Sequence, residues 1–151
     1  MNSYVYVEGN ALRYIDPLGL WVKRCARGLG DKDKPPMNPN GNPFRHDYLS
    51  VSGQVLSFQA GDSMVWSRGY IDDEEYPDNP KCTMVCEDDK FDQYVLDAAR
   101  EIGSPNYCVT AYLGTTPWFA GARNCQTWVD DVLIRAKQKY LDNEQCPKCF
   151  K

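Results

Sequence analysis

The sequence predicts an α+β domain in which a small antiparallel sheet packs against helices. Residues 124–140 and 89–102 each repeat apolar side chains at helical spacing, so that one face of each helix is apolar. Residues 44–60 form two short β-rich runs around a Ser-Gly pair, which is typical of a hairpin. The chain has 151 residues, of which 42% are hydrophobic. That is enough to bury one core.

The first half of the chain contains the predicted linker and the predicted hairpin. From residue 22 to 43 the chain is rich in Lys, Asp, Pro, Asn and Gly without apolar periodicity, which predicts a linker. The hairpin strands are expected over 44–51 and 54–60. Residues 64–66 (Met-Val-Trp) are expected to add a third short strand.

The middle of the chain alternates between loop and regular structure. Residues 70–88 are acidic and rich in turn-forming residues. Four successive acids, Asp72 to Glu75, predict a solvated loop, with a calcium-binding or partner-docking role as the alternative. The helix over 89–102 is followed by Gly103, a common helix terminator. Residues 107–113 alternate and predict a strand.

The last helix carries the main candidate for chemistry. Asn124 is suited to cap it, which puts Cys125 in the first turn. The first N–H groups of a helix stabilise an anion and can lower a cysteine pKa, and a thiolate is the nucleophilic form. The alternative is that Cys125 fills the core, as cysteines on apolar helix faces usually do.

A cysteine nucleophile needs a base, and the chain has a single histidine, His46. If the protein is a Cys-His enzyme, His46 is therefore the base. The alternative is a structural histidine. One imidazole cannot assemble a His-rich metal site, and we expect no cofactor and no catalytic metal.

The seven cysteines are an odd number, so at least one thiol stays unpaired or pairs between chains. With Cys125 set aside, the other six could form up to three disulfides, which would suit an oxidising compartment such as the bacterial periplasm. Two short-spaced pairs, Cys82 with Cys86 and Cys146 with Cys149, could instead hold a zinc ion, or the thiols could stay free. Spacing does not choose between these; the six are Cys25, Cys82, Cys86, Cys108, Cys146 and Cys149.

Charge and hydropathy narrow the function classes. The formal net charge of −4 and the lack of a basic stripe argue against nucleic acid as a partner. The sequence holds no apolar run long enough for a membrane span, and its first residues lack the pattern of a secretory signal.

The N-terminal residues resemble the end of the conserved core of Rhs and YD-repeat proteins. The match consists of a Tyr-x-Tyr-Val start at Tyr4, an Asn-x-Leu step at Asn10 and a closing Asp-Pro-x-Gly-Leu that ends at Leu20; Ala11 replaces the usual Pro. In that family the core encloses a variable C-terminal toxin and is cut just after this motif. The resemblance implies that residues 1–20 are a remnant of the core, 21–43 a linker and 44–151 the toxin domain. The alternative is an unrelated turn.

A second resemblance covers residues 44–140. A His-bearing strand with its hairpin partner, followed much later by Asn-Cys-x-x-aromatic at the start of a helix, is similar to the circularly permuted papain-like fold. That group includes NlpC-type peptidases and lecithin:retinol acyltransferase-like proteins. The resemblance implies that Cys125 is the nucleophile and His46 the general base. The third group would come from the neighbouring strand, where Ser57 or Gln59 could accept the Nδ1 hydrogen bond, although neither is the usual His, Asn or Asp.

Three further details belong to the same expectation. The backbone N–H of Cys125 could contribute to an oxyanion hole. Trp118 and Trp128 could line the cleft, although packing in the core is the favoured expectation for Trp128.

Together these features predict a secreted antibacterial toxin that cleaves amide bonds of peptidoglycan or protein through a thioester, acting in the periplasm of the target cell. Its expected partners are a cognate immunity protein and the Rhs shell of the parent chain. One alternative is a phospholipase or acyltransferase that uses the same site. The other is a non-enzymatic module stapled by disulfides or zinc, which predicts a buried Cys125 with His46 out of reach. A catalytic pair requires the two groups to approach within ~3–4 Å.

Overall fold

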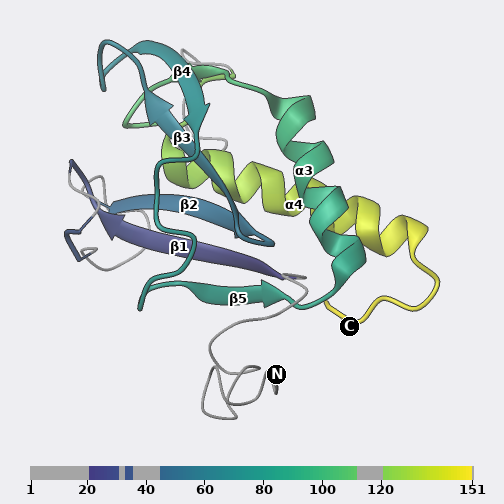
Figure 1. Ribbon diagram of the computed structural model, residues 1–151. Coiled ribbons are helices and arrows are strands. Elements are labelled where there is room, and N and C mark those ends of the chain that lie inside the picture. The colour runs from purple at the N-terminus through teal and green to yellow at the C-terminus, as the bar shows by residue number, and fades with distance from the viewer. Residues whose placement is uncertain (1–20, 31–32, 36–44, 112–120, 151) are drawn as a thin grey trace, which may run out of the picture.

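The structure, a computed structural model, describes residues 21–30, 33–35, 45–111 and 121–150. The expected Rhs remnant over 1–20 and Trp118 lie outside these residues. The described chain is α+β, as predicted, with a six-stranded antiparallel sheet in the order β5-β1-β2-β3-β4-β6 and two helices (Figure 1). The strands are β1 (Val22–Gly28), β2 (Arg45–Val51), β3 (Gln54–Ala60), β4 (Ser67–Asp72), β5 (Thr83–Cys86) and β6 (Asn106–Tyr107); the helices are α3 (Asp89–Ile102) and α4 (Cys125–Asn143).

The predicted hairpin is confirmed as β2 and β3. Ser52 and Gly53 both have positive φ, 51° and 82°, the backbone of the tight turn whose twist matches paired strands. The pairing of β2 with β3 runs only from Val51–Gln54 to Leu49–Leu56. From Ser57 onward β3 pairs with β4 on its other side. Residues 45–48 of β2 therefore pair with β1 but not with β3.

The predicted linker is wrong at its start, because Val22–Gly28 is strand β1 and lies between β5 and β2. Two arginines of this strand are paired with buried carboxylates inside the fold. Arg24 pairs with the buried Asp47, and Arg27 pairs with the buried Glu75. Polar composition predicts a linker only when the charges stay in water.

Two other strand predictions are displaced. The strand expected at 64–66 begins instead at Ser67, and Met64–Trp66 are bends. The strand expected over 107–113 is the two-residue β6, after which the chain turns; residues 112 and 113 lie outside the described residues. The acidic segment 70–88 holds the end of β4 and all of β5.

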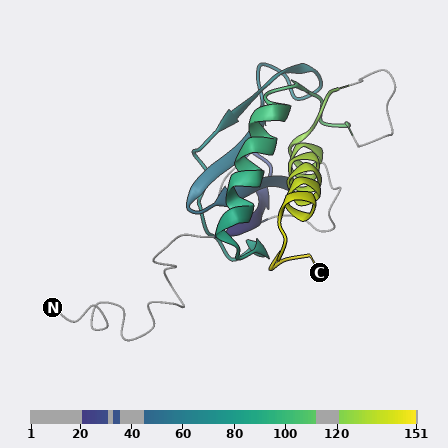
Figure 2. The same cartoon turned by 90° about the vertical axis from the view of Figure 1, so that its right-hand side faces the viewer.

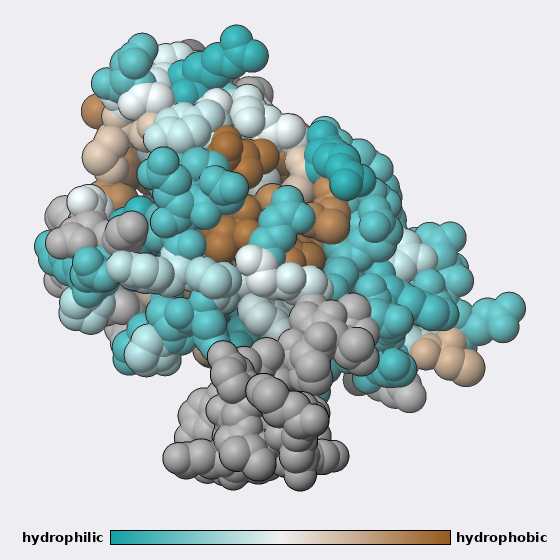
Figure 3. Space-filling model, viewed as in Figure 1, coloured by the Kyte–Doolittle hydropathy of each residue, from teal (hydrophilic) through white to brown (hydrophobic). Residues whose placement is uncertain are grey.

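Both predicted helices are confirmed. Asp88 caps α3 and Gly103, with φ 63°, ends it, whereas Asn124 caps α4. The two helices pack together on one face of the sheet (Figures 1 and 2). Trp128 of α4 is fully buried there and stacks on Phe58 of β3 with ring centroids 5.7 Å apart. In Figure 3 a few hydrophobic residues are visible between the strands and α3, and the rest of the visible surface is largely hydrophilic.

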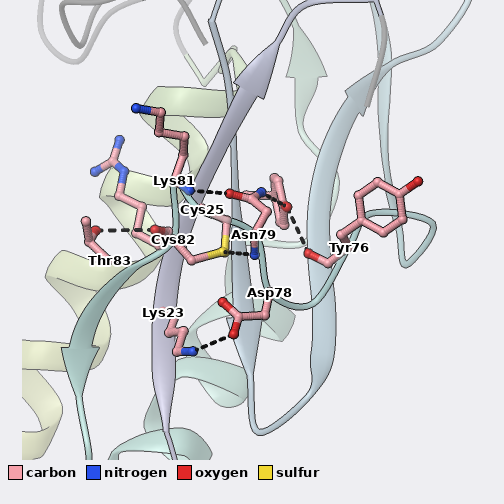
Figure 4. Close-up of a disulfide and its surroundings, with 10 residues drawn as sticks. Lys23, Cys25, Tyr76, Asp78, Asn79, Lys81, Cys82 and Thr83 are labelled. Carbon is pink, nitrogen blue, oxygen red and sulfur yellow. Dashed lines mark hydrogen bonds and ion pairs between the residues drawn. A yellow bond between two sulfur atoms is a disulfide. The ribbon is translucent and has the colours of Figure 1, made fainter. Parts of the chain in front are cut away.

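The opposite face of the sheet carries a smaller cluster of Cys25, Tyr48 and Val55, with Cys82 packed against it. Residues 73–82, here called the β4–β5 loop, provide Cys82, which forms a disulfide with Cys25 (Figure 4). In that view α4 lies behind the strands. The two faces of the sheet are therefore covered differently: α3 and α4 cover one face, and the disulfide-bonded β4–β5 loop covers part of the other.

The prediction of disulfides is confirmed for two pairs, Cys25–Cys82 and Cys86–Cys149. The second ties the C-terminal segment to β5. The zinc alternative is wrong, because three of its four proposed ligands are in these disulfides. A third disulfide is not formed, since Cys108 is buried, Cys146 is exposed and both are free. Among the described residues no helix is long and apolar enough to cross a membrane.

Candidate active site

The start of α4 is fixed by side-chain hydrogen bonds. Asn124 Oδ1 accepts the Thr127 backbone N–H at 2.8 Å, and Thr127 Oγ1 accepts the Asn124 N–H at 2.9 Å. This reciprocal capping box satisfies two backbone donors at the helix start. Asn124 Nδ2 also donates to the carbonyls of Val109 (3.1 Å) and Ala111 (2.8 Å). Cys125, the first residue of α4, is held in a defined place as a result.

The thiol of Cys125 is buried against β2. Only 3% of the residue is exposed. The thiol donates to the Arg45 carbonyl over 3.7 Å, and Gln126 Nε2 donates to the same oxygen at 3.1 Å. That carbonyl belongs to the part of β2 that β3 does not pair with, so the first turn of α4 takes the place of a strand partner.

Burial raises the pKa of Cys125 to about 11. The backbone N–H groups of Asp47 and Gln126 and the Tyr107 hydroxyl act in the opposite direction, whereas the Asp47 carboxylate adds to the increase. Removal from water outweighs the donors. The lowered pKa expected from the helix start is wrong for this arrangement, because that expectation did not include the loss of solvent.

The His46 side chain lies on the other face of the sheet. Leu49 and Val51 of β2 belong to the core under the helices, and strand alternation turns His46 and Tyr48 away from it. The His46 and Tyr48 rings are stacked, with centroids 6.2 Å apart. Burial, and next the nearby Arg27 charge, lower the pKa of His46 to about 3. The imidazole is therefore neutral at physiological pH.

His46 and the two predicted orienting residues do come together. His46 Nε2 is 2.8 Å from Ser57 Oγ, and Gln59 Nε2 donates to the same hydroxyl oxygen at 3.0 Å. The nitrogen that faces Ser57 is Nε2 and not the expected Nδ1. Within the described residues no hydrogen bond reaches Nδ1.

Sequence reasoning missed two members of this group, Glu75 and Arg27. Glu75 Oε1 lies 3.5 Å from His46 Nε2 and accepts from Gln59 Nε2 at 3.3 Å. Arg27 is the cross-strand neighbour of His46 and holds both Glu75 oxygens. Glu75 is the last of four acids in a row, and such a run gives no sign that one member turns inward. We call Arg27, His46, Ser57, Gln59 and Glu75 the imidazole cluster.

Within the described residues no hydrogen bond joins the Cys125 thiol to the His46 imidazole. The thiol contacts the backbone of Arg45 and Asp47, the residues on either side of His46, from the helix side. The imidazole leaves the same strand on the other side and reaches Ser57 on β3. The nucleophile and the base thus meet β2 at the same stretch, which pairs with β1 but not with β3, and they meet it from opposite faces. Their direct pairing stays a prediction.

A second buried charge group lies beside the thiol. Asp47 is fully buried and accepts from Arg24 Nε at 2.8 Å and from Arg45 Nε at 2.6 Å. Arg24 Nη1 also donates to Asp130 of α4 at 2.5 Å. This group ties β1, β2 and α4 together next to Cys125.

Neither a protein-family model nor a solved structure matches this chain. In the part of the chain that the structure describes, no group of three or more His, Cys, Asp or Glu side chains is arranged to hold a metal ion.

Proposed function

We propose that this chain is a cysteine hydrolase in which Cys125 is the nucleophile and His46 the general base, with a permuted papain-like arrangement. One observation carries the proposal. The capped start of α4 places the Cys125 thiol against the backbone on both sides of His46, in a stretch of β2 that has no β3 partner. The order of His-bearing strand, hairpin and Asn-Cys helix agrees with this assignment.

In the proposed reaction the Cys125 thiol gives its proton to Nδ1 of His46, the ring nitrogen nearer the backbone that the thiol contacts. The thiolate attacks the carbonyl carbon of an amide, and the oxyanion forms near the N–H groups at the start of α4. The imidazolium then protonates the leaving amine as the C–N bond breaks, which leaves a thioester. Water, activated by the imidazole, hydrolyses the thioester to a carboxylic acid and frees the thiol.

For this transfer the two buried groups must approach each other around the edge of β2 that β3 leaves unpaired at residues 45–48. A thiolate or an imidazolium alone is disfavoured by burial, as the two pKa shifts show. When both form together, each charge has an opposite charge beside it, which offsets part of the cost. The proton transfer is therefore expected to occur as one coupled step with substrate bound.

The proposed setting is that of an antibacterial toxin domain, released from an Rhs shell and neutralised by an immunity protein. The two disulfides are compatible with an oxidising compartment such as the periplasm. Peptidoglycan amide bonds are the substrate we propose first. Protein and phospholipid are the other substrates the same nucleophile could attack.

The test is growth of bacteria that express the full chain with an added export signal. We expect the wild type to inhibit growth and to release muropeptides, and Cys125→Ala and His46→Ala to do neither. Cys108→Ala is the matched control, because Cys108 is also a buried free thiol, and it should remain toxic. Release of fatty acids instead of muropeptides would assign the site to lipid. Equal growth of all four strains, with folded protein, would refute the hydrolase.

A second candidate is a non-enzymatic, disulfide-stabilised binding module. The observation that favours it is the burial of both groups without a hydrogen bond between them, Cys125 being 3% and His46 1% exposed. In that case the Cys125→Ala protein retains the toxicity or partner binding of the wild type. The growth assay separates the two candidates directly.

A further inference from the structure

One acid in the Asp72–Glu75 run is buried. Glu75 is 7% exposed, whereas Asp73 and Glu74 are exposed. Arg27 Nε donates to both carboxylate oxygens at 2.8 Å, and Arg27 Nη2 donates to Oε1 at 2.5 Å. Burying such a pair costs solvation of two charges, and replacing it with apolar side chains is often neutral or stabilising. Stability alone is thus a weak reason for this pair.

The Glu75 carboxylate is directed at the imidazole. Its Oε1 lies 3.5 Å from His46 Nε2 and is bridged to Ser57 through the Gln59 amide, which donates to both. An anionic oxygen near a ring nitrogen attracts an N–H and repels a lone pair. Ser57 Oγ, 2.8 Å from Nε2, can either donate to this nitrogen or accept from it. The charge of Glu75 therefore distinguishes the two tautomers, and it favours the one that carries its proton on Nε2.

We propose that Glu75, oriented by Arg27, is a positioning residue that keeps the proton of the neutral His46 imidazole on Nε2 and leaves the lone pair on Nδ1. Nδ1 is the nitrogen that must act as base toward Cys125, so the proposal rests on the proposed function for its consequence. In the opposite tautomer Nδ1 carries a proton and cannot accept one. Glu75 then has the role of the carboxylate in a catalytic triad, although it comes from a loop and not from β3.

The alternative is that Glu75 serves only to attach the β4–β5 loop to the sheet. That loop has other attachments, which Figure 4 shows: the Cys25–Cys82 disulfide and the pairing of Lys23 with Asp78 at 3.1 Å. Asn79 also donates to the Tyr48 hydroxyl at 2.6 Å. Removing the Glu75 charge should therefore leave the loop in place and change the imidazole.

The test reads the tautomer directly. Because His46 is the single histidine, ¹⁵N-histidine labelling of the full chain gives one pair of ring nitrogen signals, whose chemical shifts tell which nitrogen is protonated. We expect the wild type near pH 7 to be the Nε2–H form. In Glu75→Gln we expect the ratio of Nε2–H to Nδ1–H to fall about tenfold, which corresponds to ~1.4 kcal/mol. Glu74→Gln removes the same charge from an exposed neighbour and should match the wild type.

A wild-type spectrum dominated by Nδ1–H would overturn the proposal, and so would an unchanged ratio in Glu75→Gln. Glu75→Gln could fail to fold because Arg27 is left without a counter-charge. In that case the Arg27→Gln/Glu75→Gln double variant, which removes both charges, is measured in its place. The tautomer measurement needs no activity. It can therefore hold if Cys125 proves dispensable. An unchanged ratio in Glu75→Gln overturns the role of Glu75 and leaves the hydrolase proposal standing, whereas a wild type dominated by Nδ1–H would count against both.

Discussion

The Cys86–Cys149 disulfide offers the most direct test of the fold, because it joins β5 to the C-terminal segment across 63 residues. In the chain-entropy account, opening a loop of that size returns ~4 kcal/mol of freedom to the unfolded chain. Phe150 still packs on Phe91, with ring centroids 5.1 Å apart, so part of the tail contact survives in the native state. We expect Cys86→Ala/Cys149→Ala to lower the free energy of unfolding by ~3–4 kcal/mol.

The assay is urea unfolding followed by far-UV circular dichroism, with the m-value fitted separately for wild type and variant, because removing a cross-link makes the unfolded chain less compact. Cys146→Ala is the matched control, since Cys146 lies in the same tail and is free and exposed. It should unfold at the wild-type midpoint. A loss below ~1 kcal/mol in the double variant would mean that the disulfide does not constrain the unfolded chain as reasoned. A large loss of unfolding free energy in Cys146→Ala would mean that Cys146, and not only Cys86 and Cys149, takes part in a disulfide.

Two further predictions follow from the shifted pKa values. Between pH 6.5 and about 3 the unfolded chain binds a proton at His46 that the folded protein does not, so His46 makes the fold lose stability as pH falls through this window and has no effect on stability above it. In urea unfolding from pH 7 to 4, the free energy of unfolding should therefore fall less in His46→Gln than in the wild type. Parallel curves for the two proteins would contradict the assignment. With its pKa near 11, Cys125 should react with iodoacetamide at a rate that rises with pH well beyond 9, whereas the exposed Cys146 should react faster at pH 8. Mass spectrometry of the modified peptides separates the two, and faster labelling of Cys125 at neutral pH would show that the thiol is not buried as described.

The hairpin and both helices could be predicted because their signals are local. Ser52-Gly53 demands a turn with positive φ, and the apolar spacing of each helix fixes its buried face. Asn124 could be assigned as a cap because its hydrogen bond is made within three residues. The buried state of Trp128 followed from the same periodicity.

Strand β1 and Glu75 could not be predicted, because what defines them is distant in sequence. Arg27 and Glu75 are 48 residues apart, and each alone looks like a solvated charge. The predicted direction of the Cys125 pKa shift was wrong for a related reason. A helix start acts on its first residue locally, but the desolvation that outweighs it comes from burial of the thiol in the folded protein. Strand β2, some 80 residues earlier in the chain, contributes to that burial.

The arrangement of charges about β2 explains how one strand can serve both sides of the candidate site. Alternation sends Asp47 to the helix face and His46 to the loop face, and β1 supplies an arginine to each: Arg24 to Asp47 and Arg27 to Glu75. Each of these two buried carboxylates is thus paired with an arginine of β1. The thiol and the imidazole are both buried away from water on their own faces of β2, so the coupled proton transfer that we propose would encounter little competing solvent.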